Sequence, residues 1–163
     1  MKKNIIVGQS GGPTAVINGS LYGVVSEGVK KTAQIGTVYG MVNGIEGFLQ
    51  GHYMDLGALD KTNELELVRT TPGAYLGSCR YKLPEDLHDP VYPELFRRFE
   101  ELDIGYFFYI GGNDSMDTVS KLSRYAGFMN STIRFIGVPK TIDNDLVETD
   151  HTPGYGSAAK YVA

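Results

Sequence analysis

The architecture can be worked out from one stretch, Ile133-Arg134-Phe135-Ile136-Gly137-Val138-Pro139-Lys140-Thr141-Ile142-Asp143-Asn144-Asp145. Residues 133–138 are rich in β-branched side chains and predict a strand buried on both faces. Pro139 has no N–H to donate, so it predicts the end of the sheet ladder. A cation, a hydroxyl and two carboxylates follow, and open parallel sheets bind ligands beyond the carboxyl ends of their strands. We interpret the stretch as a strand leading into a ligand site, although Asp-Asn-Asp also suits a solvated turn.

The composition bounds the class of protein. The 163 residues are 42% hydrophobic and 21% charged, with a net charge of −4, which is typical of one folded domain with a core. Because the balance is acidic and lacks a basic patch, we expect no nucleic-acid partner. The apolar run at residues 5–7 is too short for a signal peptide or a membrane span. The single cysteine, Cys79, cannot form an internal disulfide, so we expect a cytoplasmic protein.

Strand patterns alternate with helix patterns along the chain. The predicted strands are 4–7, 35–39, 105–110 and 133–138. The predicted helices run from Val16 to about Val29, from Pro93 to about Leu102, from an N-cap at Ser115, and from about Gly154. Residues 40–51 predict a glycine-punctuated loop, and 55–68 show no clean period. This pattern predicts an α/β fold, a three-layer α/β/α sandwich around a mainly parallel sheet with 105–110 in its middle.

Glycine-rich loops lie where a phosphate could bind. Residues 8–14 stand between a strand and a helix, an arrangement that points backbone N–H groups at an anion. A tight strand-to-helix turn explains these residues equally well. A second glycine loop, residues 73–82, ends in Arg80 and Lys82. Exposed cations are usually plain surface, but arginine suits bidentate phosphate binding.

Three separated motifs resemble those of the phosphofructokinase family: residues 11–18 (Gly-Gly-Pro-Thr-Ala-Val-Ile-Asn), 110–115 (Ile-Gly-Gly-Asn-Asp-Ser) and 139–145. The loop at 76–80 is similar to a fourth family segment. The resemblance covers nearly the whole chain in order, and it is most specific at 139–145. It implies transfer of a phosphoryl group to the 1-hydroxyl of fructose 6-phosphate, reversibly and within glycolysis.

The resemblance also implies roles for individual residues. Asp143 matches the general base for the sugar hydroxyl, and Thr141 matches a contact to the phosphoryl group or sugar. Ile142 lies between them in the same substrate-binding run. The implied catalytic group also includes Lys140, Asp114 and Asp145. The implied donor-binding residues are Gly12, Arg80, Lys82, Gly112, Asn113, Asp114, Ser115 and Lys140.

Two positions bear on the phosphoryl donor. Members of the family that use ATP have glycine at the positions of Asp114 and Lys140. Two negative charges about 4 Å apart repel by about 1 kcal/mol in water and by more in a cleft, so Asp114 would oppose the α-phosphate of ATP. Lys140 would stabilise the departing phosphate of a small donor. Both features resemble the pyrophosphate-dependent branch, and Ile45, at a position that carries an aromatic under adenine in some ATP enzymes, points the same way.

The resemblance implies Mg²⁺ as cofactor. The family usually has an aspartate where this chain has Asn113, which brings a carbonyl oxygen but no charge. We therefore expect the donor phosphates, water and Asp145 to hold the metal, with Asn113 a doubtful ligand.

The sequence leaves two alternatives to pyrophosphate–fructose-6-phosphate 1-phosphotransferase: an ATP-dependent phosphofructokinase, and a phosphate-binding fragment or subunit without turnover. No C-cap follows the last predicted helix, so we expect residues 1–163 to be the N-terminal, donor-binding part of a longer protein, truncated inside a helix. Family members are longer, and a second half and a neighbouring subunit supply sugar-phosphate contacts. The full-length protein is thus expected to be a homo-oligomer.

Overall fold

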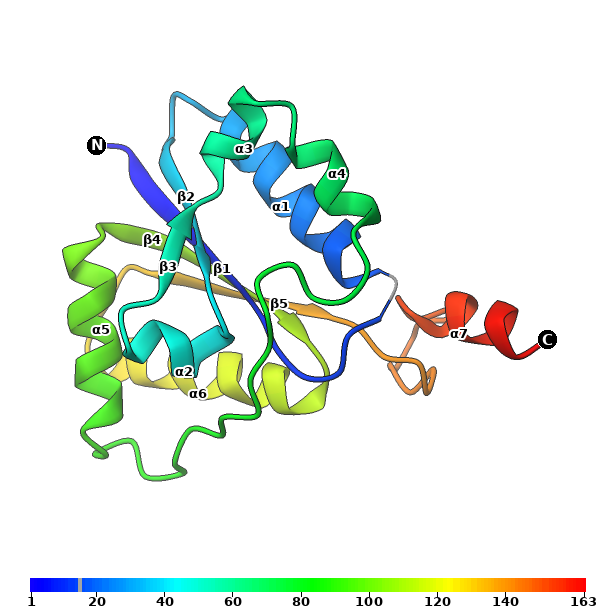
Figure 1. Cartoon of the computed structure of the whole chain (residues 1–163). Coiled ribbons are helices and arrows are strands. Elements are labelled where there is room, and N and C mark those ends of the chain that lie inside the picture. The colour runs from blue at the N-terminus through cyan, green and yellow to red at the C-terminus, as the bar shows by residue number, and fades with distance from the viewer. Residues whose placement is uncertain (15) are drawn as a thin grey trace.

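A computed structural model describes residues 1–14 and 16–163, which form a five-stranded sheet between helices (Figure 1). The strands are β1 (Lys3–Gln9), β2 (Ile35–Met41), β3 (Tyr53–Asp55), β4 (Ile104–Gly111) and β5 (Arg134–Pro139). Their order across the sheet is β3-β2-β1-β4-β5, and only the β2–β3 pair among them is antiparallel. The predicted mainly parallel sheet is confirmed, and so is the interior position of β4.

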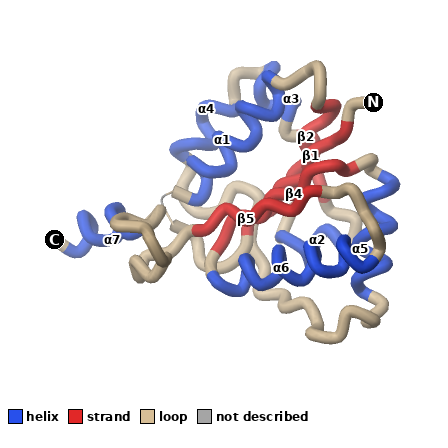
Figure 2. The backbone as a smooth tube through the Cα atoms, turned by 180° about the vertical axis from the view of Figure 1, so that it is seen from behind, coloured by secondary structure: helices blue, strands red, loops and turns tan. Residues whose placement is uncertain are grey.

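Helices cover both faces of the sheet (Figure 2). One face carries α1 (Ile17–Lys30), α3 (Gly57–Lys61) and α4 (Leu65–Thr70), and the other carries α2 (Gly44–Leu49), α5 (Val91–Glu101) and α6 (Asn113–Phe128). Each face has its own core, because side chains alternate along a strand. Ile5 and Val7 of β1 join the cluster under α1, whereas Ile6 joins the cluster under α5 and α6. The three-layer α/β/α sandwich is confirmed.

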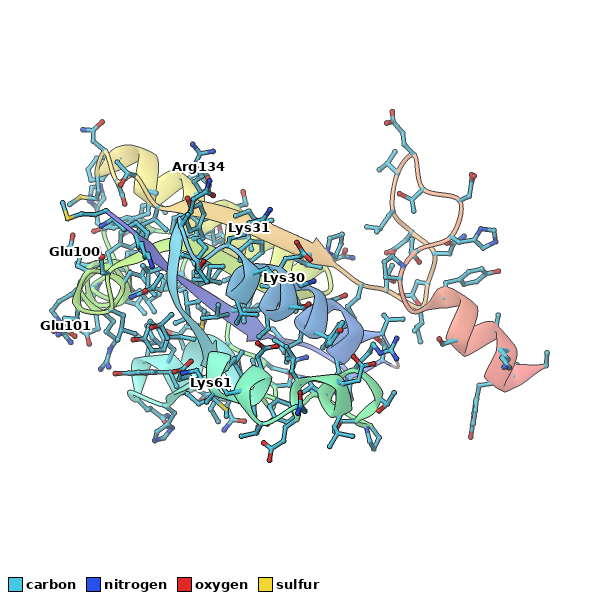
Figure 3. All side chains as sticks on the ribbon, turned by 90° about the horizontal axis from the view of Figure 1, so that it is seen from above. Lys30, Lys31, Lys61, Glu100, Glu101 and Arg134 are labelled. Atoms are coloured by element: carbon cyan, nitrogen blue, oxygen red, sulfur yellow. The ribbon has the colours of Figure 1, made fainter. Side chains whose placement is uncertain are left out.

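The C-terminal segment, residues 140–163, projects from the sandwich (Figure 1; Figure 3). Helix α7 (Tyr155–Val162) has no buried residue in the described chain, and Figure 1 shows it beyond the carboxyl ends of the strands. Among the described residues, none of the helices combines the length and apolar character that a membrane span needs.

Residues 40–51 do not form the expected loop, because they contain the end of β2 and all of α2. The glycines here serve close packing. A side chain at Gly47 would place its Cβ 1.8 Å from the carbonyl oxygen of Val42. Residues 55–68, which had no clean period, contain the end of β3, the whole of α3 and most of α4. Short elements of this kind bury too few residues to produce a readable period.

Two helix starts also differ from expectation. Helix α5 begins at Val91 because the Asp89 carboxylate accepts the Val91 N–H at 2.9 Å, which leaves Pro93 inside the first turn. Helix α6 begins at Asn113 with Gly112 in the N-cap position, so Ser115 is a buried residue of the first turn rather than the cap. Glycine can take the N-cap position because it has no side-chain restriction there.

Strand β5 is half-buried rather than buried on both faces. It pairs with β4 on one side and is the outermost strand of the sheet among the described residues. Pro139 does not end the pairing but is the last residue of β5, and the Lys140 N–H still donates to the Gly111 carbonyl at 3.0 Å. Proline is tolerated in an outer strand because its nitrogen need not face a neighbour.

Candidate functional site

Three loops meet beyond the carboxyl ends of β1, β4 and β5, which are adjacent and parallel. They enclose a cavity of about 240 Å³, called here the first cavity. The residues that line it are Gly12, Pro13, Thr14, Gly112, Asn113, Lys140, Thr141, Ile142 and Asp143. The fold therefore brings all three motifs singled out in the sequence to one place.

A second cavity of about 230 Å³ adjoins the first. The residues that line it are Ser10, Gly11, Gly12, Cys79, Arg80, Tyr81, Lys82 and Asp114. Gly12 lines both cavities, so the glycine loop after β1 lies between them. The end of the loop at 73–82 thus lines the second cavity.

Buried polar side chains hold this loop in place. Gln9, fully buried at the end of β1, accepts the Leu76 N–H at 2.9 Å and donates to the Asn18 side-chain oxygen at 2.9 Å. Asn18, also buried, donates to backbone carbonyls of the loop. The Ser78 hydroxyl donates to the Gly11 carbonyl at 2.6 Å. Neither Gln9 nor Asn18 was predicted as a site residue, since nothing in their local sequence marks them as partners of a loop some 60 residues away.

Lys140 is a buried cation that lines the first cavity. Its side chain is 7% exposed, and its ammonium donates to the Gly12 carbonyl. It makes no ion pair with a carboxylate in the part of the chain that the structure describes. Burial lowers the pKa of Lys140, because the charged form loses hydration. An anion in the first cavity would compensate this charge.

Asp114 forms an ion pair at the second cavity. Its carboxylate lies 3.1 Å from the Lys82 ammonium, and both side chains are 72% exposed. An exposed pair of this kind contributes little to stability and can open without large cost. The pair stands at the second cavity with Arg80, so two cations and one carboxylate face the same space.

Asp143 lies on a loop whose residues hydrogen-bond to one another. Its N–H donates to the Thr141 hydroxyl at 3.0 Å. The Thr141 N–H donates to the Pro153 carbonyl at 2.9 Å, and the Thr152 hydroxyl donates back to the Thr141 carbonyl at 3.2 Å. Asn144, with a φ of 54°, receives the Thr152 N–H at 3.0 Å. The Asp143 residue itself is exposed at the first cavity, a position from which its carboxylate could accept a proton.

Three residues named from the sequence are not placed at a cavity by the described chain. Asp145 is exposed on the 141–153 loop and lines neither cavity. Ser115 is buried against Gly111, where a Cβ would come within 2.0 Å of its hydroxyl oxygen. Ile45 is buried in the core under α5 and α6, so its side chain is not available to a nucleotide. Conversely, Thr14 lines the first cavity unpredicted, and its buried hydroxyl has no hydrogen-bond partner among the described residues.

The donor set does not fit a preformed magnesium site. Within residues 1–14 and 16–163, no three His, Cys, Asp or Glu side chains come close enough to hold a metal ion. Asn113 and Asp143 line the first cavity with one carboxylate between them. Mg²⁺ is commonly held by one or two carboxylates together with substrate phosphates, so the residues present suit a metal that arrives with the donor.

Seen from above, the site lies at the end of the molecule where residues 140–163 project (Figure 3). The labelled Glu100 and Glu101 lie at the opposite end.

Comparisons with known proteins agree with this geometry. Residues 4–163 match the family model described as phosphofructokinase. The chain is 48% identical to a pyrophosphate–fructose 6-phosphate 1-phosphotransferase of Rhodospirillum rubrum, over 99% of this chain and 39% of that protein. It is 30% identical to an ATP-dependent 6-phosphofructokinase of Glaesserella parasuis, over 97% of this chain and 45% of that protein.

A solved structure is also similar. The crystal structure of a pyrophosphate-dependent phosphofructokinase from Nitrosospira multiformis is 45% identical, with a TM-score of 0.90, over 98% of this chain and 39% of that one. The chain therefore spans less than half the length of each of these relatives.

Proposed function

The chain belongs to the phosphofructokinase family, and from that premise we propose that the complete protein transfers a phosphoryl group from pyrophosphate to the 1-hydroxyl of fructose 6-phosphate. The observation that carries the proposal is the placement of Asp114 and Lys140. A carboxylate stands at the second cavity, where a donor longer than two phosphates would have to extend, and a buried ammonium lies beside the first.

The two cavities suggest how the donor lies. The transferring phosphoryl group would occupy the first cavity, near Lys140, Thr141 and Asp143. The departing phosphate would extend past Gly12 toward Arg80 and Lys82 in the second. Backbone N–H groups of the glycine loops and the cations would neutralise the phosphate oxygens, while Asp143 accepts the proton of the sugar hydroxyl. In this scheme positioning and charge neutralisation supply most of the catalysis.

Lys82 would also affect which donor binds. With pyrophosphate bound, its ammonium could leave Asp114 for a phosphate oxygen, because an exposed pair is easily exchanged. With ATP bound, the same movement would leave the Asp114 carboxylate unpaired near the α-phosphate, and like charges repel. The site would thus reject ATP by an electrostatic penalty that pyrophosphate avoids.

Magnesium would enter as part of the magnesium–pyrophosphate complex. Asn113 could contribute a carbonyl oxygen at the first cavity, with the donor phosphates and water as the other ligands. When bound, the metal would offset part of the phosphate charge. We assign no ligand role to Asp145, which stands outside both cavities in the described residues.

We further propose that residues 1–163 are the N-terminal, donor-binding part of a cytoplasmic, homo-oligomeric enzyme of glycolysis. The support is length, since the matched region is 39% of the Rhodospirillum relative. Contacts to the sugar phosphate would then come largely from residues outside this chain.

Donor preference tests the proposal directly. In the complete protein, kcat/KM would be measured with pyrophosphate and with ATP for wild type, Asp114→Gly, Lys140→Gly and the double variant. We expect Asp114→Gly to admit ATP, and Lys140→Gly to lower pyrophosphate turnover by about 10²–10³ without creating ATP activity. The double variant should shift furthest toward ATP, although effects at one site need not add.

Two other results would point to the alternatives. If the wild type already prefers ATP, the result would favour an ATP-dependent phosphofructokinase. One relative that is 30% identical to this chain has that name. Binding of either donor without turnover by any variant, in the presence of fructose 6-phosphate, would favour a non-catalytic phosphate-binding protein.

A further inference from the structure

Lys121 on α6 is a buried cation outside both cavities. Its side chain is only 4% exposed. Lysine is almost never buried to this degree unless its charge is paired. The ammonium lies 2.7 Å from the Asp117 carboxylate and 2.5 Å from the Glu85 carboxylate, and it donates to the Leu83 carbonyl at 3.0 Å. An ammonium has three N–H donors, so all of them are used.

These partners come from two different segments. Asp117 is on the same helix, one turn before Lys121, whereas Leu83 and Glu85 belong to the segment that follows Lys82. The hydrogen bonds to Asp117 and then to Glu85 raise the pKa of Lys121, so the charged form persists. Lys121 therefore links the backbone of residues 83–85 to helix α6.

The side of α6 that carries Lys121 also carries Asp114, which lines the second cavity. Asp114, Asp117 and Lys121 are spaced three and four residues apart, which places them along one side of the helix. Asp114 pairs with Lys82, and Lys121 holds Leu83 one residue further on. The Arg80–Lys82 segment thus lies between two fixed points: the Cys79 carbonyl, which accepts the Gly11 N–H at 3.4 Å, and the Leu83 carbonyl on Lys121.

We propose that Lys121 is a positioning residue, which fixes Arg80 and Lys82 at the second cavity by anchoring Leu83 and Glu85 to α6. The inference rests on the proposed donor role of the Arg80–Lys82 segment. Lys121 touches neither cavity, so its removal should act on donor binding through the loop. Leu83 is itself 3% exposed in the core, and Lys121 would set the direction of the backbone that leads into it.

The decisive variant is Lys121→Met in the complete protein, since methionine keeps an unbranched stem and removes only the ammonium. We expect the KM for pyrophosphate to rise about tenfold, because a charged hydrogen bond that orders the donor loop is lost. The kcat at saturating donor and the KM for fructose 6-phosphate should stay within about twofold. General destabilisation would instead lower kcat for every substrate together.

Hydrogen exchange supplies a readout that does not depend on turnover. In Lys121→Met, the Gly11 amide, which donates to the Cys79 carbonyl where the loop segment begins, should exchange faster, while the amides of α5 stay as in wild type. Asp117→Asn is the matched control: it alters the partner on the helix and leaves both loop contacts of Lys121 in place. The donor KM and the exchange of the Gly11 amide should both be unchanged in that variant.

A second variant guards against loss of folding. Glu85 has a side chain that is 83% exposed, so Glu85→Gln removes the negative charge of one loop contact without entering the core. It should raise the donor KM in the same direction as Lys121→Met, but by less.

Unchanged donor KM and unchanged exchange of the Gly11 amide in both Lys121→Met and Glu85→Gln would overturn the proposal. Lys82→Met separates this failure from failure of the donor site. A raised donor KM in Lys82→Met with none in Lys121→Met refutes the anchor alone. If Lys82→Met and Lys121→Met both keep the wild-type KM for the donor, the assigned role of the loop is refuted. The proposal for Lys121 then fails as well.

Discussion

At the scale of single residues, the site contrasts a buried cation with an exposed acid. Lys140 is enclosed between the glycine loop and β5, whereas Asp143 stands on a loop open to water. Burial makes the lysine charge effective on a phosphate, because water screens it less. The Asp143 carboxylate stands at the first cavity, where it would accept the proton of the sugar hydroxyl. The two side chains therefore suit different parts of the proposed reaction.

Asp143→Ala in the complete protein should lower turnover by about 10²–10⁴-fold or more, which is the usual contribution of a positioned acid–base group. Donor binding should remain nearly intact, because the cations that would hold the donor are elsewhere. Steady-state kinetics and donor titration would measure both quantities. Asp150→Ala, an exposed acid on the same loop that lines neither cavity, is the control. Activity within a few-fold of wild type would remove Asp143 from the role.

Lys140 predicts a pH dependence. Because burial lowers its pKa, the ammonium loses its proton at a lower pH than an exposed lysine does. The charged form is the one that binds phosphate, so kcat/KM for pyrophosphate should fall as pH rises through that lowered pKa. Lys140→Arg keeps its charge throughout, and its alkaline limb should move to higher pH even if the rate is lower. Profiles with the same alkaline limb for both proteins would contradict this assignment.

At the scale of elements, the distance between α1 and the sheet depends on one glycine. A Cβ at Gly28 would lie 2.9 Å from a methyl carbon of Val38 in β2 and 3.0 Å from the terminal methyl of Ile5 in β1. Gly23 is on the exposed side of the same helix, where a Cβ would meet nothing within 4 Å. One helix thus contains a glycine that packing requires and another that it does not.

These two glycines should respond oppositely to alanine. Gly28→Ala should destabilise the fold by about 1–3 kcal/mol through overpacking against the strands. Gly23→Ala should stabilise it by about 0.5–1 kcal/mol, since glycine is the poorer residue in a helix interior. Thermal unfolding midpoints of the complete protein would show both effects. A lower midpoint for Gly23→Ala than for Gly28→Ala would contradict the packing argument.

At the scale of the whole molecule, the described chain is a packed α/β/α body with a projecting segment. Apolar side chains are exposed along that segment, among them Ile142, Val147, Tyr161 and Val162. Helix α7 buries none of its residues in the described chain, so packing contributes little to its stability there. One wall of the first cavity belongs to this segment.

We accordingly expect the purified 163-residue chain to fold only marginally and to show no transferase activity. The proposed sugar-phosphate contacts lie outside it, and the segment that bears Asp143 would be poorly fixed. The assay is formation of fructose 1,6-bisphosphate from pyrophosphate and fructose 6-phosphate, with the complete protein as positive control. Product formed by the short chain would refute the expectation.

Local sequence patterns were sufficient for the class of fold and for the three motifs at the first cavity. Alternation of strand and helix periods predicts the layers, and an uncharged apolar run predicts the interior strand β4. Motifs that directly follow parallel strands must meet at one edge of the sheet, so their convergence could also be foreseen. The short helix α2 could not, because it begins at Gly44, where a Cβ would meet Cys79 and Tyr109, which are distant in sequence.

The partners of the charged groups were decided by packing. Nothing near Asp114 in sequence indicates that Lys82 neutralises it, and the Lys140 ammonium reaches a carbonyl 128 residues away. Lys121 looks like an ordinary surface lysine until α6 meets the segment after Lys82. Residue type and period are local properties, so they can be read along the chain. Burial and pairing of a charge depend on which segments come together in three dimensions, and they determine how each charge behaves.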